Sequence, residues 1–266
     1  MVSALLWFVP FAVLPTILAV VADRRWRPGV LVAVSSRGVV TAAALGVASV
    51  AVFGYLAGKA LALGERGIDH PVFRWAAGHQ VVWWTEANKV LTQMGGRSEA
   101  KALAVLAAVV LAVLIRPVWL APAALAFAYG LERIGQEVLA RLVDRGHPPT
   151  TLGTYPSGGC ARIVAVYGTV VLLLVASGLI RGRWRTAAWA VVALAAGVEG
   201  YTRIYLLKHW ATDAVGGWLF GGLVLAAVAG IVLAVRAKPG AVSPRWPRRV
   251  TAPNEPALAT ARSARS

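Results

Sequence analysis

The residues best suited to chemistry lie in the stretch TRIYLLKHWATD, at positions 202–213. His209 and Asp213 are four residues apart, so on a helix they would share one face, and the carboxylate would hydrogen-bond one imidazole nitrogen. This bond fixes the tautomer and raises the basicity of the other nitrogen, as a histidine nucleophile or general base requires. Arg203 precedes His209 across an expected turn between two helices, close enough to bind an anion beside it. The stretch therefore predicts nucleophilic attack on a bound anion.

A second stretch, TYPSGGCAR at positions 154–162, predicts where that anion binds. Ser157, Gly158 and Gly159 stand directly before an apolar run, so we expect their backbone N–H groups to be unpaired at a helix start, where the helix dipole favours an anion. Ser157 is expected to donate to the anion rather than act as a nucleophile, because the pattern is not a strand–turn–helix elbow. Nearby positive charge comes from Arg141, Arg145, His147, Arg162 and Arg203.

The elements that position these residues are predicted to be transmembrane helices. Hydrophobic residues make up 58% of the 266-residue chain and charged ones 14%, too little polar surface for a water-soluble fold. Seven stretches have spanning length: Val2–Ala22, Gly38–Gly58, Ser98–Ile115, Pro117–Ala140, Ile163–Ile180, Thr186–Thr202 and Ala214–Val235. Charged residues within or beside the third, fourth and sixth of these spans make them less apolar than the others.

The distribution of charge predicts the orientation in the membrane. With the N-terminus outside, the cytoplasmic segments hold 15 of the 27 Lys and Arg residues but only Asp23 and Glu255 of the 11 acids. This positive-inside pattern accounts for the net charge of +16 without a nucleic-acid partner. The C-terminus is then cytoplasmic, and the segments 140–149, 154–162 and 202–213 all meet the extracytoplasmic face. An isolated His/Asp pair is more simply an ion-paired helix end, but this convergence favours a functional site.

The predicted domain organisation is all-α. Residues 1–37 form an extra N-terminal transmembrane helix and a cytoplasmic loop, which we favour over a cleaved secretory signal because no basic region precedes the apolar run. Residues 38–235 form a six-helix membrane domain, and residues 236–266 a disordered, basic cytoplasmic tail rich in Pro, Ser, Ala and Arg. Within the domain, residues 59–98 form an outer segment whose apolar periodicity and tryptophans suggest a helix in the membrane interface, either a lid or a platform for lipid.

Other charged residues and the single cysteine are expected to be structural. Cys160 excludes an intrachain disulfide framework and a zinc ligand cluster. Charged side chains within transmembrane spans usually face protein or water, and we expect those of this chain to form ion pairs instead of a transport pathway. The expected pairs are a ladder of Arg133, Glu137 and Arg141 at spacings of four, and Glu199 with Arg203 at the same spacing.

These residues resemble the type 2 phosphatidic acid phosphatase superfamily of membrane lipid phosphatases, whose motifs are KxxxxxxRP, PSGH and SRxxxxxHxxxD on a six-helix core. The resemblance covers residues 69–235. In the third motif Thr202 replaces serine, while Arg203, His209 and Asp213 keep their spacing. The resemblance implies that His209 attacks phosphorus to form a phosphohistidine, that Asp213 orients it and that Arg203 holds phosphate oxygens.

Two motifs depart from this pattern. PSGH reads PSGG, so the histidine expected to protonate the leaving group is Gly159. In the first motif the lysine position is Ala140 and the arginine position is His147. Arg141 lies one residue from the lysine position and would point about 100° away on a helix, and we expect Arg145 to substitute in part. A general acid commonly contributes about 10²–10⁴-fold. Three outcomes are open: His147 supplies the acid, the substrate has a better leaving group such as a diphosphate, or the pocket binds a phospholipid without turnover.

The sequence thus predicts a multi-pass cell-membrane protein acting at the extracytoplasmic face on a phospholipid or polyprenyl (di)phosphate, as a phosphatase or phosphotransferase without metal or cofactor. The alternative is a catalytically impaired lipid-phosphate-binding protein or scaffold, with an envelope-synthesis protein as partner. PSGG favours this alternative. The intact third motif favours the enzyme, because a pure binder has little need of the His209–Asp213 pair.

Overall fold

The computed structural model describes residues 36–150, 153–236 and 243–244, and these are almost entirely helical. The predicted first transmembrane helix and most of the predicted tail lie outside the described residues. Six long helical runs match the six spans predicted for the core. They are α2 (Ser36–Ala62), α5 (Arg97–Leu114), α6 (Leu120–Val143), the run of α7 (Gly158–Arg162), η3 (Ile163–Tyr167) and α8 (Gly168–Ala176), α9 (Arg183–Tyr205), and α10 (Ala211–Arg236).

Three of these runs are long and apolar enough to cross a membrane by composition: Val39–Ala62, Gly158–Ala176 and Ala211–Arg236. α5, α6 and α9 have comparable lengths but carry charges near the end where the candidate site lies. They are the spans in which the sequence already showed charge. Their charged ends are consistent with helices whose polar residues face other protein groups instead of lipid.

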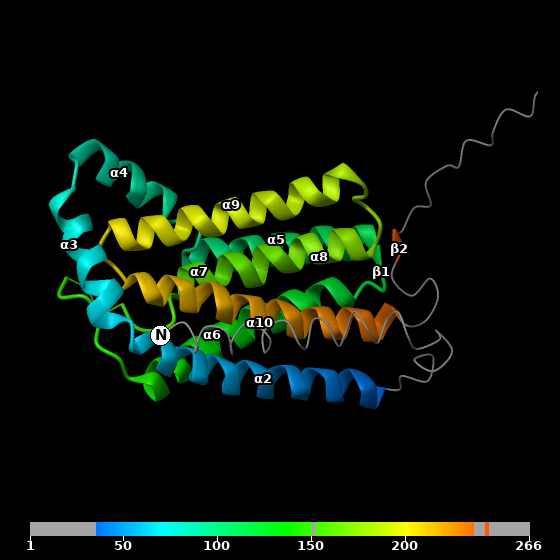
Figure 1. The fold of residues 1–266 in the computed structure, drawn as a ribbon. Helices are drawn as coiled ribbons and strands as arrows, with labels where there is room; N and C mark the ends of the chain where they lie inside the picture. The colour runs from blue at the N-terminus through cyan, green and yellow to red at the C-terminus, as the bar shows by residue number, and fades with distance from the viewer. Residues whose placement is uncertain (1–35, 151–152, 237–242, 245–266) are drawn as a thin grey trace, which may run out of the picture.

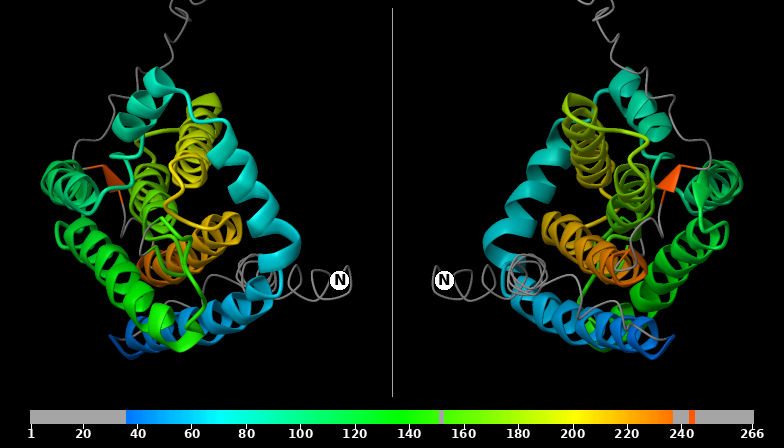
Figure 2. Two further views of the ribbon diagram at one scale, coloured as in Figure 1. Left: turned by 90° about the vertical axis from the view of Figure 1, so that its left-hand side faces the viewer. Right: turned by 90° about the vertical axis from the view of Figure 1, so that its right-hand side faces the viewer.

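The run of α7, η3 and α8 lies at the centre of the bundle, and the other long helices surround it (Figure 2). Two-thirds of its apolar window is buried, compared with about a tenth for α2. α10 packs along α2 and also along α7 (Figure 1). Because α10 contacts both the central run and an outer helix, it determines how the start of the central run is placed.

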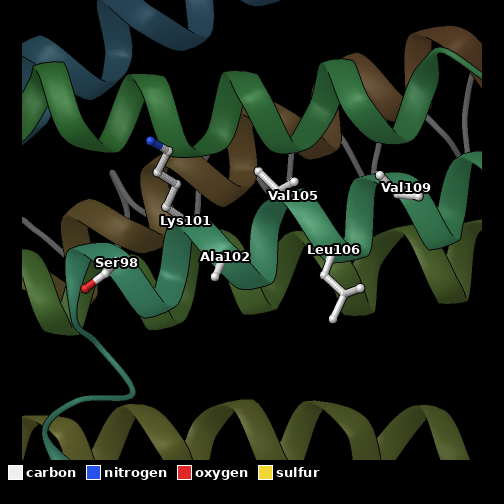
Figure 3. Close-up of a pocket in the computed structure, with 6 residues that line it drawn as sticks. All are labelled: Ser98, Lys101, Ala102, Val105, Leu106 and Val109. Carbon is white, nitrogen blue, oxygen red and sulfur yellow. The ribbon is translucent and has the colours of Figure 1, made fainter.

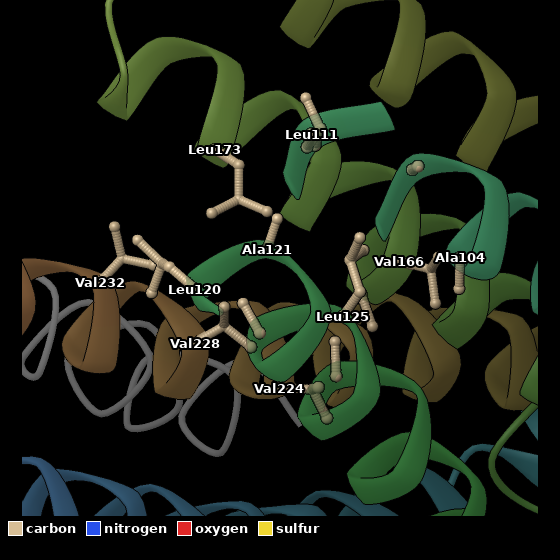
Figure 4. Packing of buried hydrophobic residues seen from close by; sticks show 14 of the residues in the cluster. Ala104, Leu111, Leu120, Ala121, Leu125, Val166, Leu173, Val224, Val228 and Val232 are labelled. Carbon is tan, nitrogen blue, oxygen red and sulfur yellow. The ribbon is translucent and has the colours of Figure 1, made fainter. Parts of the chain in front are cut away.

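The hydrophobic core fills the middle of the bundle with aliphatic side chains, mostly from α5, α6, η3, α8 and α10 (Figure 4). Several of the buried residues of α5 and α6 are alanines. Core side chains include Ala104, Leu111, Leu120, Ala121, Leu125, Val166, Leu173, Val224, Val228 and Val232.

The outer segment forms two helices instead of the single one predicted. After η2 (Glu65–Asp69), α3 (His70–Gly78) and α4 (Val82–Leu91) are separated by a break at 79–81. The break is held from below by α9, because the Tyr205 hydroxyl accepts a hydrogen bond from Val81 N at 2.9 Å and Gln80 donates to Tyr205 O at 2.8 Å. Trp75 and Trp83 remain more than half exposed. Both helices lie across one end of the bundle (Figure 1).

The opposite end carries a short antiparallel pair between β1 (Ile115–Arg116) and β2 (Ser243–Pro244). Residues 243–244 belong to the predicted tail, so this part of it is ordered against the bundle. Along α5, a groove of about 590 Å³ opens on the bundle's outer side (Figure 3). Its lining is apolar apart from two polar groups near the N-terminal end of α5, and comprises Ser98, Lys101, Ala102, Val105, Leu106 and Val109. None of these is a predicted site residue.

Candidate active site

The three predicted segments meet at the end of the bundle beneath α3 and α4 (Figure 1). Arg203 is in the last turn of α9, and His209 lies in the short connection to α10. Ser157 is the N-cap residue of α7, and residues 144–149 follow α6. The convergence predicted from charge and spacing is therefore present in the fold.

His209 and Asp213 face one another, although not as neighbours on one helix. α10 begins at Ala211, so His209 precedes the helix and Asp213 is in its first turn. Nδ1 of His209 lies 3.5 Å from Asp213 Oδ2. The same carboxylate oxygen accepts a hydrogen bond from Trp210 N at 3.1 Å, the backward bond of a capping box. Asp213 is fully buried, while the imidazole keeps 11% of its surface exposed.

Arg145 is committed to a buried network that the sequence did not reveal. Its guanidinium contacts Asp69 Oδ2 at 2.5 Å, the Thr212 hydroxyl at 2.7 Å and, at 3.5 Å, Asp213 Oδ1. Asp69 also accepts hydrogen bonds from the backbone N–H and hydroxyl of Thr212. Arg145 was expected to bind phosphate, but here it pairs with Asp69, lies beside Asp213, and donates to the Thr212 hydroxyl at the start of α10. Asp69 gave no signal in the sequence because no fixed spacing connects it to the motifs.

The PSGG turn is wedged against α10. Ser157 N donates to the backbone oxygen of Asp213 at 3.0 Å, which connects the turn directly to the residue that faces His209. A Cβ at Gly217 would overlap Ser157 O, and one at Gly216 would overlap the Tyr155 ring. The helix start predicted at Ser157–Gly159 is present, but the Ser157 side chain makes no capping bond and is fully buried.

Gly159 faces an ion pair. Arg203 Nε donates to Glu199 Oε1 at 2.6 Å, which confirms the pair expected from their spacing. A Cβ at Gly159 would lie 2.7 Å from Arg203 Nε and Nη2 and would overlap Glu199 Oε1. The space beside the last glycine of PSGG is thus filled by a carboxylate and a guanidinium from α9.

The structure places two other predicted residues nearer the surface. Arg141 binds Glu137, which also binds Arg133, so the predicted ladder on α6 is confirmed. The Arg141 side chain is 76% exposed, and this pairing does not bring it to the glycine turn. His147 is exposed and its Nδ1 lies 2.9 Å from Pro148 O. The backbone oxygen of its neighbour Gly146 accepts a hydrogen bond from the Trp210 indole at 2.8 Å. This bond holds the segment after α6 beside the α9–α10 connection, which contains His209.

A third buried ion pair involves Arg162, the last residue of α7. Arg162 Nη1 contacts Glu132 Oε1 at 3.2 Å, and Arg162 Nε donates to Gly95 O at 2.9 Å. Arg162 was expected only to add positive charge near the anion; the structure commits it to α6 and to the segment before α5. Glu132 is one of the charges in the predicted fourth span, and its spacing from Arg162 gives no sign that the two residues pair.

Two basic residues, Lys208 and Arg203, lie in or beside the connection that carries His209. Lys208 precedes the histidine, and burial together with the neighbouring Arg203 lowers the pKa of its ammonium group. Arg203 keeps 15% of its side chain exposed, and His209 a similar fraction. The site thus has a partly accessible imidazole that faces a carboxylate, and a partly accessible guanidinium at the glycine turn. These are groups that can bind a phosphate and attack it.

Comparisons with known proteins agree with this architecture. No family model matches the chain, and no curated protein matches it. Among solved structures, the chain is similar to the crystal structure of a transmembrane PAP2 type phosphatidylglycerolphosphate phosphatase from Bacillus subtilis. The TM-score is 0.60 at 23% sequence identity, over 67% of this chain and 94% of that one. The chain therefore has the fold of a transmembrane PAP2-type phosphatase, as its three motifs imply.

Proposed function

We propose that this membrane protein is a phosphatase or phosphotransferase for a lipid phosphate, either a phospholipid or a polyprenyl (di)phosphate, with His209 as the nucleophile. The observation that carries the proposal is that Asp213 contacts both the His209 ring and the PSGG turn. Asp213 faces the His209 ring with its carboxylate and accepts a hydrogen bond from the PSGG turn with its backbone oxygen. A protein that only binds phosphate has no need of this bracing.

The reaction follows from the orientation of the ring. Because Nδ1 faces Asp213, Nε2 attacks phosphorus and forms an N–P bond while the P–O bond to the lipid breaks. The leaving oxygen either belongs to the remaining phosphate of a diphosphate or takes a proton from His147. Arg203 stabilises the charge on the phosphoryl oxygens, and Asp213 stabilises the imidazolium. Water, or an acceptor hydroxyl in a phosphotransfer, then attacks the phosphohistidine and regenerates the imidazole. The proposal involves no metal and no cofactor.

The site is proposed to lie at the extracytoplasmic face, with the N-terminus outside and the C-terminus in the cytoplasm. At the opposite end of the described bundle the charged residues are arginines without acids among them: Arg116, Arg181, Arg183, Arg185 and Arg236. Positively charged connections favour the cytoplasmic side. The two helices over the site carry exposed tryptophans, consistent with a platform at the lipid–water interface.

The first test is phosphate release from lipid phosphates and diphosphates by the purified full-length protein in detergent. His209→Ala is expected to lower turnover by at least about 10⁴-fold, as loss of a catalytic nucleophile does. His79→Ala is the matched control, because this exposed histidine stacks on Trp75. Turnover that survives in His209→Ala would contradict the proposal.

A second candidate function is a lipid-phosphate-binding protein or scaffold, with an envelope-synthesis protein as partner. The observation that favours it is the filled space at Gly159, which leaves no imidazole there to protonate a leaving alkoxide. Under this alternative, no substrate releases phosphate, while binding of a lipid phosphate is measurable and weakens in Arg203→Ala. His147→Ala separates the remaining catalytic outcome, because it abolishes turnover only where His147 supplies the acid.

A further inference from the structure

The carboxylate of Glu199 is enclosed by parts of the chain that are far apart in sequence. Its side chain is fully buried, and it receives the Arg203 Nε hydrogen bond on Oε1. A Cβ at Gly95 would overlap this oxygen and lie 2.5 Å from Cδ, and a Cβ at Gly159 would overlap the oxygen as well. The Glu199 side chain therefore fits only because residues 95 and 159 have no Cβ.

Arg203 is oriented by the contacts around this carboxylate. Nε is used by Glu199, and Nη2 donates to Thr92 O, at the end of α4, at 3.4 Å. A guanidinium has five N–H donors in a rigid plane, so fixing Nε fixes the direction of the others. The side chain is 15% exposed, so part of it stays accessible. Removal of Glu199 would leave a buried charge without its strongest partner.

We propose that Glu199 is a positioning residue for phosphate binding, and that Glu199 and Gly159 form a matched pair. Glu199 occupies the place that a motif-two side chain would take and holds Arg203 toward the phosphate, while glycine at 159 is required because Glu199 is there. This inference rests on the proposed function, in which the site accepts a lipid phosphate. Glu199 acts through Arg203 and does not deliver a proton to the leaving group, because a carboxylate paired with arginine is a hydrogen-bond acceptor.

A histidine placed at 159 would meet the same two side chains. Its Cβ alone would contact Arg203 and overlap Glu199. Gly159→His is therefore expected to disturb the site instead of restoring a general acid, unless Glu199 is shortened at the same time. The departure from PSGH thus links two positions: glycine at 159 in α7 makes room for the glutamate at 199 in α9.

The test is a double-mutant cycle on the full-length protein in nanodiscs, with binding of dioctanoyl phosphatidic acid as the main measurement. Glu199→Ala is expected to weaken binding by about tenfold to hundredfold, the cost of leaving a buried donor unpaired. Gly159→Ala is expected to weaken binding similarly, because its Cβ displaces the pair. The double variant Gly159→Ala/Glu199→Ala should bind no more weakly than the worse single variant, because shortening Glu199 frees the space.

Glu199→Gln separates positioning from proton donation. Its amide oxygen still accepts the Arg203 Nε–H, so we expect only a few-fold weaker binding and a raised KM, with kcat changed less, because the hydrogen bond keeps its charged donor and loses only the negative charge of the acceptor. Glu86→Gln is the matched control, since its ion pair with Lys89 is exposed. Gly197→Ala is the control for glycine replacement, because a Cβ there meets nothing within 4 Å.

Three results would overturn the inference. Additive losses in the double variant would show that residues 159 and 199 are independent. Loss of turnover in Glu199→Gln with unchanged binding and KM would make Glu199 a proton donor. An equal loss of binding in Gly197→Ala would make the effect a general one of glycine replacement. If the native protein binds phosphatidic acid but releases no phosphate, the proposed catalytic function fails while the binding cycle still decides this inference.

Discussion

At the scale of single residues, the site depends on a buried carboxylate outside all three motifs. Asp69 binds Arg145 and both polar groups of Thr212, and all of these side chains are buried or nearly so. It therefore neutralises the arginine that also lies beside Asp213. Without Asp69, Arg145 would compete with His209 for the Asp213 carboxylate.

Asp69→Asn is expected to destabilise the protein by about 3–5 kcal/mol, because it breaks a buried ion pair and leaves Arg145 with only its longer carboxylate contact, to Asp213. Thermal unfolding of the purified protein in detergent measures the effect. Glu65→Gln is the control: its contact with His70 is exposed on both sides, and its effect is expected to stay within about 0.5 kcal/mol. Similar midpoints for the two variants would show that the Asp69 network contributes little to stability.

At the scale of elements, α10 positions the PSGG turn through its glycines. A Cβ at Gly217 would overlap Ser157 O and lie 2.8 Å from the Cys160 Cβ. Gly222, one turn and a residue later on the same helix, has nothing within 4 Å of an added Cβ. The two glycines thus share a helix but differ in what they contact.

Gly217→Ala is expected to lower stability by about 1–3 kcal/mol through overpacking against the turn. Gly222→Ala is expected to raise it by about 0.5–1 kcal/mol, since alanine favours a helix over glycine where space allows. Unfolding midpoints of the two variants, with phosphatidic acid binding as a second measurement, test the contrast. A neutral Gly217→Ala would mean that the turn is not held by α10.

The same elements show how far sequence carried the prediction. Apolar runs located the six long helices, and the charges in α5, α6 and α9 marked the spans that composition does not support alone. Helical spacing predicted the Glu199–Arg203 pair and the α6 ladder. The break at 79–81 was missed, because it depends on Tyr205 and Gln80 meeting across the fold.

Contacts between distant segments account for what sequence could not give. Asp69 meets Arg145, and Glu199 fills the space beside Gly159, at separations with no fixed periodicity. From the sequence, Gly159 is only a position where the expected histidine is missing. The structure adds that Glu199 and Arg203 of α9 lie against it. The sequence predicted that Arg145 and Arg162 supply positive charge to a bound anion, whereas each has a buried carboxylate partner.

At the scale of the whole molecule, the two ends of the bundle differ in charge. The end with the site carries acids and bases together, many of them paired, while the described residues at the other end carry arginines without acids. Under the positive-inside rule, this asymmetry predicts the orientation of the chain. Under the proposed function, the orientation decides whether His209 would meet lipid phosphates in the outer or the inner leaflet.

Labelling of introduced cysteines with a membrane-impermeant maleimide on intact spheroplasts tests this orientation. The background is Cys160→Ala, which removes the buried native thiol and should not label. Gly78→Cys, at the end of α3 where an added Cβ meets nothing within 4 Å, is expected to label from outside. Arg185→Cys, at the opposite end on exposed α9 surface, is expected to label only after permeabilisation, because a membrane-impermeant reagent cannot cross to the side where positive connections are retained. The reverse pattern would place His209 in the cytoplasm and limit its substrates to lipid phosphates of the inner leaflet.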